Sequence, residues 1–392
     1  MIIVISWLGC LKGSYIRLSE GKIWMKNFMY TNCTLLNEDI FLIGHLGGFP
    51  ARMHSDGNID YYDMMQGFVE KETGVVIDFM DYFQNKVYAL DSKEGNLIIF
   101  NLQKQECKYI PLGCRYKSLM NFAVFERYGS DYYIFPKHEN SFFIFDTNEE
   151  KIRKIKNCPN WWDKIQCACR VKDSIWILSG DTETLWCYYL SDGEIKVYGL
   201  ERTIKDCVHA FYDGEAIFFL NRYGIIYIWD INKNEMSEIT DLETEHIECE
   251  SVSRIIHAGN RLILLPASGN DIKILDLETE KAEIYQDYPK DFIFEKEKYK
   301  FYGYCEDETS YIFAMCFGNY FLKIDKNSGK LAWIKPITDL LGKKAVEFMR
   351  KQVIYEEILD ITDLLEINLP DIYEDDKALI GKEIYRCMET RG

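Results

Sequence analysis

Three features of the sequence predict an all-β fold built from a repeated unit. Strand-forming residues are abundant, with Tyr 27 and Phe 23 against Pro 8, and 47% of the 392 residues are hydrophobic. Short apolar segments recur at separations of 42 to 50 residues. Each is followed by a polar turn and an alternating strand, as in FFIFDTNEEK and FLKIDKNSGK. Alternation with a period of two indicates strands and not helices.

The centres of the recurring segments are large apolar residues. They are Phe41, Tyr88, Tyr133, Trp176, Phe218, Ile263 and Phe313. A fixed period in the forties with several strands per repeat is typical of the blades of a β-propeller, whereas solenoid repeats of similar length show helical periodicity. The sequence therefore predicts a β-propeller of seven to eight four-stranded blades, with each of these anchor residues in a different blade.

The strand that follows an anchor often ends in Asp, as at Asp146, Asp230, Asp276 and Asp325. An Asp side chain can accept a hydrogen bond from the backbone two residues further on. Because the same position recurs in successive repeats, we interpret these aspartates as turn residues and not as ligands.

The repeats predict a propeller over residues 1–336, of which 28–336 form seven full units. Residues 1–27 contain IIVISW and SYIRLSEGKIWMK, which match the last three strands of a unit, so we favour eight blades with a partial first one. Either that blade has three strands, or a C-terminal segment such as KQVIYEEI supplies the fourth. The alternative interpretation of the apolar start is an export signal, but no positive charge precedes it.

A helical pattern replaces the strand period after the last repeat. The apolar residues Ile354, Ile358, Ile361 and Leu365 follow at steps of 4, 3 and 4, which is the spacing of one helix face. We predict that residues 337–392 form a helical tail packed on the propeller, where it would cover the edge left by a partial blade. The alternative is a docking segment for a partner protein.

Composition excludes several ligands and partners. The chain has 63 acidic and 46 basic residues, and a net charge of −17 repels phosphate backbones and anionic lipids. We therefore expect no nucleic acid and no membrane partner. The 13 cysteines form no CxxC pair, and the close pair Cys167 and Cys169 falls on one face of a strand. This pattern favours buried, reduced thiols, no bound metal and a cytoplasmic location.

One stretch carries a family resemblance. The sequence IDKNSGKLAW resembles the repeat of pyrroloquinoline-quinone propellers, and the general layout is similar to WD-repeat and kelch propellers. The adjacent cysteines of the quinone enzymes are absent. The resemblance therefore implies the propeller architecture and no cofactor.

Candidate binding residues lie in four irregular loops. In a propeller, the connections from second to third strand and from fourth to first strand share one rim around the central funnel. These loops carry side chains that can stack on a polar ligand or form hydrogen bonds with it. They are His45, Lys137, His138, Trp161, Trp162, Arg222 and Tyr223.

The sequence contains no catalytic template such as HExxH, a P-loop, a dinucleotide fingerprint or a nucleophile elbow. We therefore favour a noncatalytic binding or scaffold propeller whose rim holds a protein or peptide, with no catalytic residue and no cofactor. The alternative is an enzyme or carbohydrate-binding propeller with a site for a small polar ligand in the funnel. Clustered charged groups at the funnel would favour this alternative, and a flat aromatic rim would favour the scaffold.

Overall fold

The computed structural model describes most of the repeat region. The described residues are 16–19, 22–25, 28–44, 50–62, 65–67, 76–92, 94–114, 122–137, 139, 141–156, 165–180, 183–221, 224–239, 252–267, 270–279, 281–294 and 301–336. All of them lie in one unit, Tyr15–Val346; a second unit, Met1–Ser14 with Glu347–Gly392, falls outside them. The described residues form strands and turns, and none of them belongs to a helix long and apolar enough to cross a bilayer.

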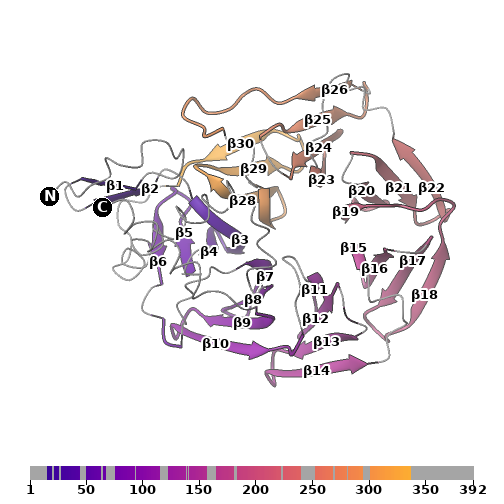
Figure 1. Cartoon of the computed structure of the whole chain (residues 1–392), viewed down its shortest axis with the longest axis horizontal. Helices are drawn as coiled ribbons and strands as arrows, with labels where there is room; N and C mark the ends of the chain where they lie inside the picture. The colour runs from indigo at the N-terminus through magenta and orange to yellow at the C-terminus, as the bar shows by residue number, and fades with distance from the viewer. Residues whose placement is uncertain are drawn as a thin grey trace, which may run out of the picture. The chain divides into compact units, whose positions relative to one another are not determined.

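Seven antiparallel four-stranded sheets follow one another along the chain and surround a common axis (Figure 1). Blade 1 contains β3 (Phe28–Leu36), β4 (Asp39–Gly44), β5 (Pro50–Met53) and β6 (Ile59–Tyr61). Blade 2 contains β7 (Ile77–Phe83), β8 (Lys86–Asp91), β9 (Asn96–Asn101) and β10 (Glu106–Pro111). Blade 3 contains β11 (Phe122–Tyr128), β12 (Asp131–Pro136), β13 (Ser141–Asp146) and β14 (Lys151–Lys156).

The remaining blades repeat this order from the innermost to the outermost strand. Blade 4 contains β15 (Ile165–Val171), β16 (Ser174–Ser179), β17 (Thr184–Tyr189) and β18 (Ile195–Gly199). Blade 5 contains β19 (Cys207–Tyr212), β20 (Ala216–Asn221), β21 (Ile226–Asp230) and β22 (Glu235–Ile239). Blade 6 contains β23 (Val252–Ala258), β24 (Arg261–Pro266), β25 (Lys273–Asp276) and β26 (Lys281–Ile284). Blade 7 contains β27 (Phe301–Glu306), β28 (Ser310–Gly318), β29 (Phe321–Asp325) and β30 (Leu331–Ile334).

The seven anchor residues each lie in the second strand of a different blade, which confirms the prediction. Each of them keeps 7% or less of its surface exposed. A second strand is paired on both sides, and both of its faces pack against neighbouring blades, so its side chains are shielded in every direction. This burial explains why the second strand gives the strongest signal in the sequence.

The turns that follow the third strands have the predicted chemistry. Asp146 Oδ1 accepts hydrogen bonds from the backbone N–H groups of Asn148 and Glu149, at 2.8 and 3.1 Å. Asp230, Asp276 and Asp325 accept equivalent pairs of bonds from the residues two and three positions further on. These carboxylates therefore hold turns, as the sequence indicated.

The ring has seven blades, and the preference for eight is not confirmed. The strands β1 (Ile16–Ser19) and β2 (Lys22–Met25) pair with each other and with no other described strand. Blade 1 has all four of its strands between Phe28 and Tyr61, so it lacks no inner strand. A short hairpin with alternating apolar residues has the same sequence pattern as two strands of a blade, and that similarity produced the wrong count.

The helical tail predicted for 337–392 lies outside the described residues.

Blade 7 closes the ring directly against blade 1. The end of β28 pairs with the start of β3 through Cys316↔Met29 and Gly318↔Phe28. Below this pairing, buried side chains from the two blades form one apolar cluster, which includes Cys33, Leu42, Ile312, Ala314 and Phe321. Among the described residues, the closure therefore combines backbone pairing with apolar packing between blades 7 and 1.

Every inner strand has a register shift close to its start. A bulge of this kind bends the strand and redirects one side chain. At several blade boundaries a polar side chain at or beside the shift bonds the backbone of the next blade. Asn32 Nδ2 donates to Asp78 O at 2.9 Å, and Phe122 N donates to Asp78 Oδ2 at 3.0 Å. Further round the ring, Cys207 N donates to Gln166 Oε1 at 2.9 Å.

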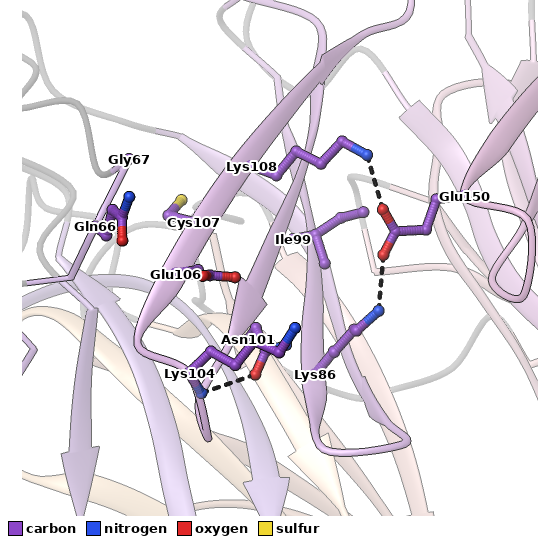
Figure 2. A pocket seen from close by; sticks show the side chains of 10 residues that line it. All are labelled: Gln66, Gly67, Lys86, Ile99, Asn101, Lys104, Glu106, Cys107, Lys108 and Glu150. Atoms are coloured by element: carbon purple, nitrogen blue, oxygen red, sulfur yellow. Dashed lines mark hydrogen bonds and ion pairs between the residues drawn. The ribbon is translucent and has the colours of Figure 1, made fainter.

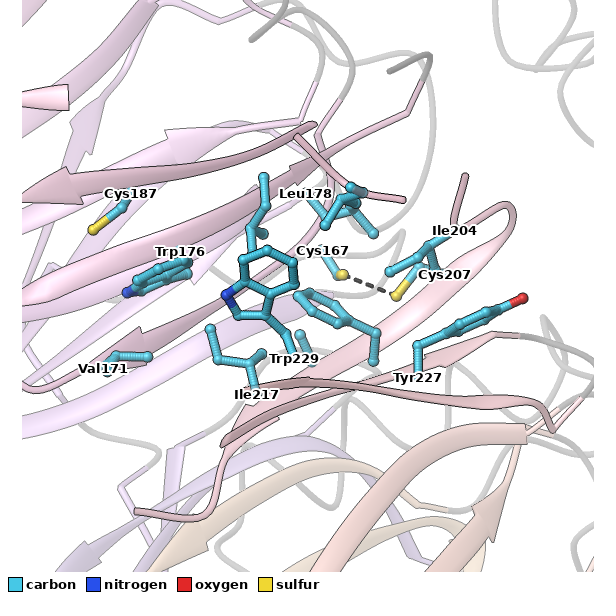
Figure 3. Close-up of a cluster of buried hydrophobic side chains, with 14 residues drawn as sticks. Cys167, Val171, Trp176, Leu178, Cys187, Ile204, Cys207, Ile217, Tyr227 and Trp229 are labelled. Carbon is cyan, nitrogen blue, oxygen red and sulfur yellow. Dashed lines mark hydrogen bonds between the residues drawn. The ribbon is translucent and has the colours of Figure 1, made fainter. Parts of the chain in front are cut away.

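Apolar clusters fill the spaces between the blades, and the one between blades 4 and 5 is drawn in Figure 3. Trp229 is 1% exposed at its centre, and Trp176 packs nearby with its ring stacked on Tyr198 at 5.0 Å. The Trp229 indole N–H has no hydrogen-bond partner among the described residues. The contribution of Trp229 to stability therefore comes from packing.

We expect Trp229→Ala to lower the free energy of unfolding by about 3–5 kcal/mol, because it opens a large cavity between two blades. Trp229→Phe should cost less, since it keeps part of the ring and removes an unpaired N–H. Urea denaturation measures both values. Val197→Ala is the control: Val197 is 49% exposed on β18, so the change should stay below about 0.5 kcal/mol. An equal loss for Trp229→Ala and Val197→Ala would contradict the packing role.

Candidate functional site

The predicted site residues belong to loops on one rim of the ring. Those loops connect β4 to β5, β12 to β13, β14 to β15 and β20 to β21, and the antiparallel strand order brings all four connections to the end where the inner strands start. Of the predicted residues, only Lys137 is described. The other six, which are His45, His138, Trp161, Trp162, Arg222 and Tyr223, lie outside the described residues, so their roles stay predictions.

Lys137 directly follows β12 and lies near the axis. Its pKa is lowered, first because burial disfavours the charged ammonium. Asp78 raises the same pKa and Arg254 lowers it, and these residues belong to blades 2 and 6. Charges on blades 2 and 6 can both shift the pKa of a side chain from blade 3 only if that side chain lies close to the ring axis.

The ammonium of Lys137 has no hydrogen bond or ion pair to another described residue. Part of the residue is still exposed, so solvent reaches it although protein surrounds it. Asp78, the nearby carboxylate, uses Oδ2 to accept the Phe122 N–H. The structure therefore holds a desolvated cation at the axis without a bonded counter-ion in the described part of the chain.

His209 lies near the same end of the axis and has a structural contact. Its Nδ1 accepts the Ile255 N–H at 3.4 Å, which joins blade 5 to blade 6. Burial lowers the pKa of His209 well below the ordinary value, and the nearby Arg254 lowers it further. The ring is therefore neutral at physiological pH, as an accepting Nδ1 requires.

A second group of charges lies further along the inner strands. Asp81 Oδ2 is 3.2 Å from Arg127 Nε and accepts the Tyr132 hydroxyl at 2.7 Å. Arg170 Nη1 is 3.5 Å from Glu126 Oε2 and donates to Arg127 O at 2.6 Å. The inner strands of blades 2, 3 and 4 thus contribute a chain of alternating charges, which we call the axial charge cluster: Asp81, Glu126, Arg127 and Arg170.

Glu126 is the most perturbed carboxyl of this cluster. Burial raises its pKa to about 7, and Asp81 and Glu306 add to the effect, while Arg170 opposes it. Its side chain nevertheless keeps 35% of its surface accessible. Glu126 is therefore surrounded by protein and reached by water, which is the environment of a group that can exchange a proton near neutral pH.

Blades 6 and 7 complete the polar lining of the axis. Arg254 Cζ lies 4.7 Å from the centre of the Tyr304 ring, so a guanidinium of β23 stacks on an aromatic face of β27. Burial raises the pKa of Tyr304, which keeps its hydroxyl protonated. Six blades, 2 to 7, therefore bring ionisable side chains towards the axis.

A separate pocket of about 390 Å³ lies on the outer side of blade 2 (Figure 2). Glu150, from a turn of blade 3, reaches Lys86 and Lys108 at 2.7 Å each. Hydrogen bonds from Lys108 and Lys86 lower the pKa of Glu150, so it stays ionised. This carboxylate forms ion pairs with both lysines and so links blade 3 to blade 2. We therefore interpret the charged groups of this pocket as a contact between the two blades.

The other described histidines also have structural partners. His54 contacts Asp60 and Asp39 on blade 1, at 2.9 and 3.3 Å. His257 lies 3.4 Å from Asp213 and packs against the Phe218 ring. Over the described ranges, no three His, Cys, Asp or Glu side chains gather in an arrangement that would hold a metal ion.

Sequence reasoning missed the axial charge cluster, although a signal for it exists. Asp81 and Glu126 are each paired with the anchor of their blade, Tyr88 and Tyr133. Both therefore lie seven positions before their anchors, in strands that also contain several apolar and aromatic residues. Polar residues at this repeat position would have pointed to the axis.

Comparisons with known proteins confirm the class of fold. No protein family model matches the chain, and no curated protein matches it by sequence. Among solved structures, a catalytically inactive virginiamycin B lyase from Staphylococcus aureus with quinupristin has a TM-score of 0.57 and 15% identity, covering 79% of this chain and 97% of that one. The protein is a seven-bladed β-propeller, and at this identity the likeness shows the fold alone.

Two further structures are similar to the same extent. YCF48 bound to D1 peptide has a TM-score of 0.55 and 8% identity, covering 76% of this chain and 91% of that one. PorZ of Porphyromonas gingivalis, described as a surface component of the type-IX secretion system, has a TM-score of 0.55 and 12% identity. This chain spans 40% of PorZ, and the match covers 84% of this chain. Propellers of this form thus include both enzymes and proteins that bind peptides.

We expect Glu126→Gln to change how stability depends on pH. Native Glu126 takes up its proton near pH 7 and the unfolded chain near 4.5, so the native state binds more protons between these values. The contribution of Glu126 to stability is present below pH 4.5 and is lost as the pH rises through 7. Gln has no such dependence, so the Tm of the variant relative to the wild type should rise between pH 5 and pH 8.

Differential scanning fluorimetry at several pH values tests this expectation. Glu106→Gln, which removes an exposed carboxylate on β10, is the matched control. Parallel Tm curves for Glu126→Gln and the wild type would show that Glu126 does not titrate in this window.

Proposed function

We propose that this propeller is a noncatalytic binding protein that holds an acidic segment of a peptide or protein partner at the axis. The observation that carries the proposal is the desolvated ammonium of Lys137, which has no bonded counter-ion among the described residues and lies at the end where the inner strands start. A buried cation without a bonded counter-ion costs stability, and a ligand carboxylate would supply the missing partner. Arg254 adds a second positive charge near the same place.

The positive charges near Lys137 contrast with the negative net charge of the whole chain. With 63 acidic and 46 basic residues, the protein repels acidic ligands at most of its surface. A carboxylate would therefore be favoured only where cations are concentrated. Lys137 and Arg254 place two positive charges beside the loops that the sequence identified as irregular, together with the carboxylate of Asp78, which already accepts the Phe122 N–H.

A peptide or protein suits the site because the surrounding rim offers many loops. The connections between second and third strands and those between blades all end here, so an extended partner can contact several blades at once. YCF48, which has the same fold class, has been solved with a peptide bound. That example supports the use of a propeller as a peptide-binding surface and carries no residue across to this chain.

An enzyme with its site at the axis is the alternative function. It is favoured by Glu126, because a carboxyl with a pKa of about 7 next to Arg170 suits general acid–base catalysis. The clustered charges at the axis were the expected sign of this alternative. The described histidines, however, have structural partners, so the binding function is the better supported one.

A peptide array tests the proposed function. Each synthetic peptide would be present in an acidic form and in a form with Asn and Gln replacing Asp and Glu, and with either a free or an amidated C-terminus. We expect the full chain to retain acidic forms preferentially. The free and amidated ends show whether a side-chain or a terminal carboxylate is bound. Equal retention of acidic and amide forms would overturn the proposal.

We expect Lys137→Met to reduce binding of the retained peptides by about tenfold or more, the effect of losing a charge-assisted hydrogen bond. The same variant should be more stable. The pKa of Lys137 is lower in the native state, so folding disfavours the charged form and the ammonium opposes folding at neutral pH. The Tm should therefore rise by about 1–3 °C.

Lys281→Met is the matched control, since Lys281 is an exposed lysine at the start of β26. It removes the same charge from the chain and should leave both affinity and Tm unchanged. Fluorescence anisotropy and scanning fluorimetry provide the two measurements. A Lys137→Met protein that binds normally, or that loses binding together with stability, would contradict the proposed role.

A further inference from the structure

We propose that Cys33 and Cys305 are a site of intramolecular disulfide formation that closes the propeller ring covalently. Cys33 lies on β3 of blade 1 and Cys305 on β27 of blade 7. Their Sγ atoms are 3.5 Å apart although 272 positions separate them in the sequence. The two thiols therefore face each other across the boundary where the first and last blades meet.

This boundary differs from the other six. Each of the other pairs of neighbouring blades is joined by the chain segment that runs from a fourth strand to the next inner strand. Blades 7 and 1 are the two ends of the repeat, so pairing between β28 and β3 and the packing around Cys33 hold them together. We therefore expect the ring to open at this boundary when it opens without unfolding a blade.

The accessibility of the two thiols depends on whether the ring is closed or open. In the closed ring Cys33 is 0% exposed and Cys305 is 8% exposed. The hydrogen bond with Cys33, together with burial, raises the pKa of Cys305 and keeps its thiol unreactive. An opened boundary exposes both thiols, and reclosure brings them together again. Reaction therefore takes place in the open state, and the product is held in the closed one.

The reaction requires a low-molecular-weight disulfide as the oxidant. The thiolate of one cysteine attacks a sulfur of this disulfide, which gives a mixed disulfide and one released thiolate. The second cysteine thiolate then attacks the protein sulfur of the mixed disulfide, forming the Cys33–Cys305 bond and releasing the second small thiolate. The two protons of the cysteines end on the two released thiols, so one disulfide is reduced as one is formed.

A second thiol pair provides an internal control. Cys167 and Cys207 face each other across blades 4 and 5, with their Sγ atoms 3.0 Å apart and 40 positions between them (Figure 3). The chain already joins these two blades through residues 200–206. A bond there would close a much shorter loop, and it should stabilise the protein less than a bond across 272 positions.

Incubation of the full chain with oxidised glutathione tests the proposal. We expect peptide mapping by mass spectrometry, without reduction, to find the peptides containing Cys33 and Cys305 linked. The Tm should rise by on the order of 5 °C, and dithiothreitol should reverse the rise. Urea below the unfolding transition should speed the reaction, because it favours opening of the boundary.

Two variants show which pair of cysteines causes the rise in Tm. Cys305→Ala should abolish both the linked peptide and the rise in Tm, whereas Cys207→Ala should keep both. If Cys305→Ala folds poorly, peptide mapping of the wild type decides the matter alone. Glutathione attached to single cysteines without the Cys33–Cys305 bond, or the bond without a rise in Tm, would overturn the proposal.

Discussion

Contact between neighbouring blades is the interaction on which the rest of this structure depends. A four-stranded sheet with two apolar faces is unstable in water, and the ring arrangement buries both faces of every blade against its neighbours. The clusters between blades contain most of the buried side chains, such as those around Trp229. Because a ring has no free end, this arrangement works only if blade 7 also meets blade 1.

The start of each inner strand serves the same requirement. The repeated register shifts let side chains such as Asn32, Asp78 and Gln166 reach the backbone of the next blade. These bonds satisfy polar backbone groups that lie near the axis, where no further strand can pair with them. Polar residues close to the axis therefore include some that join blades and others, such as Lys137, that have no bonded partner among the described residues.

Buried charged groups near the axis carry a cost in stability. Lys137 and Glu126 have pKa values shifted towards the neutral form by burial, so each charged form opposes folding. A protein selected for stability alone would place apolar residues at these positions. Their presence at the axis, beside loops that vary from blade to blade, is the physical basis for placing a binding function there and not at the outer pocket near Glu150.

Much of the fold follows from the sequence because it depends on local patterns. The Asp turns such as Asp325 arise from contacts within one repeat. The anchors from Phe41 to Phe313 pack against neighbouring blades, but every blade meets its neighbours in the same way, so they recur with the period in the forties. Residues 16–25 show the limit of such patterns. A hairpin has the same alternation whether it belongs to a blade or pairs only with itself, and the pattern alone suggested an eighth blade.

Only the tertiary structure decided how many blades close the ring and which residues meet at its axis. Lys137 was a candidate from its loop, but the charges that act on it, Asp78 and Arg254, belong to blades 2 and 6, which are distant in the sequence. Glu126 and Arg170 belong to different blades, and so do Cys33 and Cys305 at the closing boundary. Each of these pairs forms because the blades turn around a common axis, and a linear sequence records the repeats without recording that rotation.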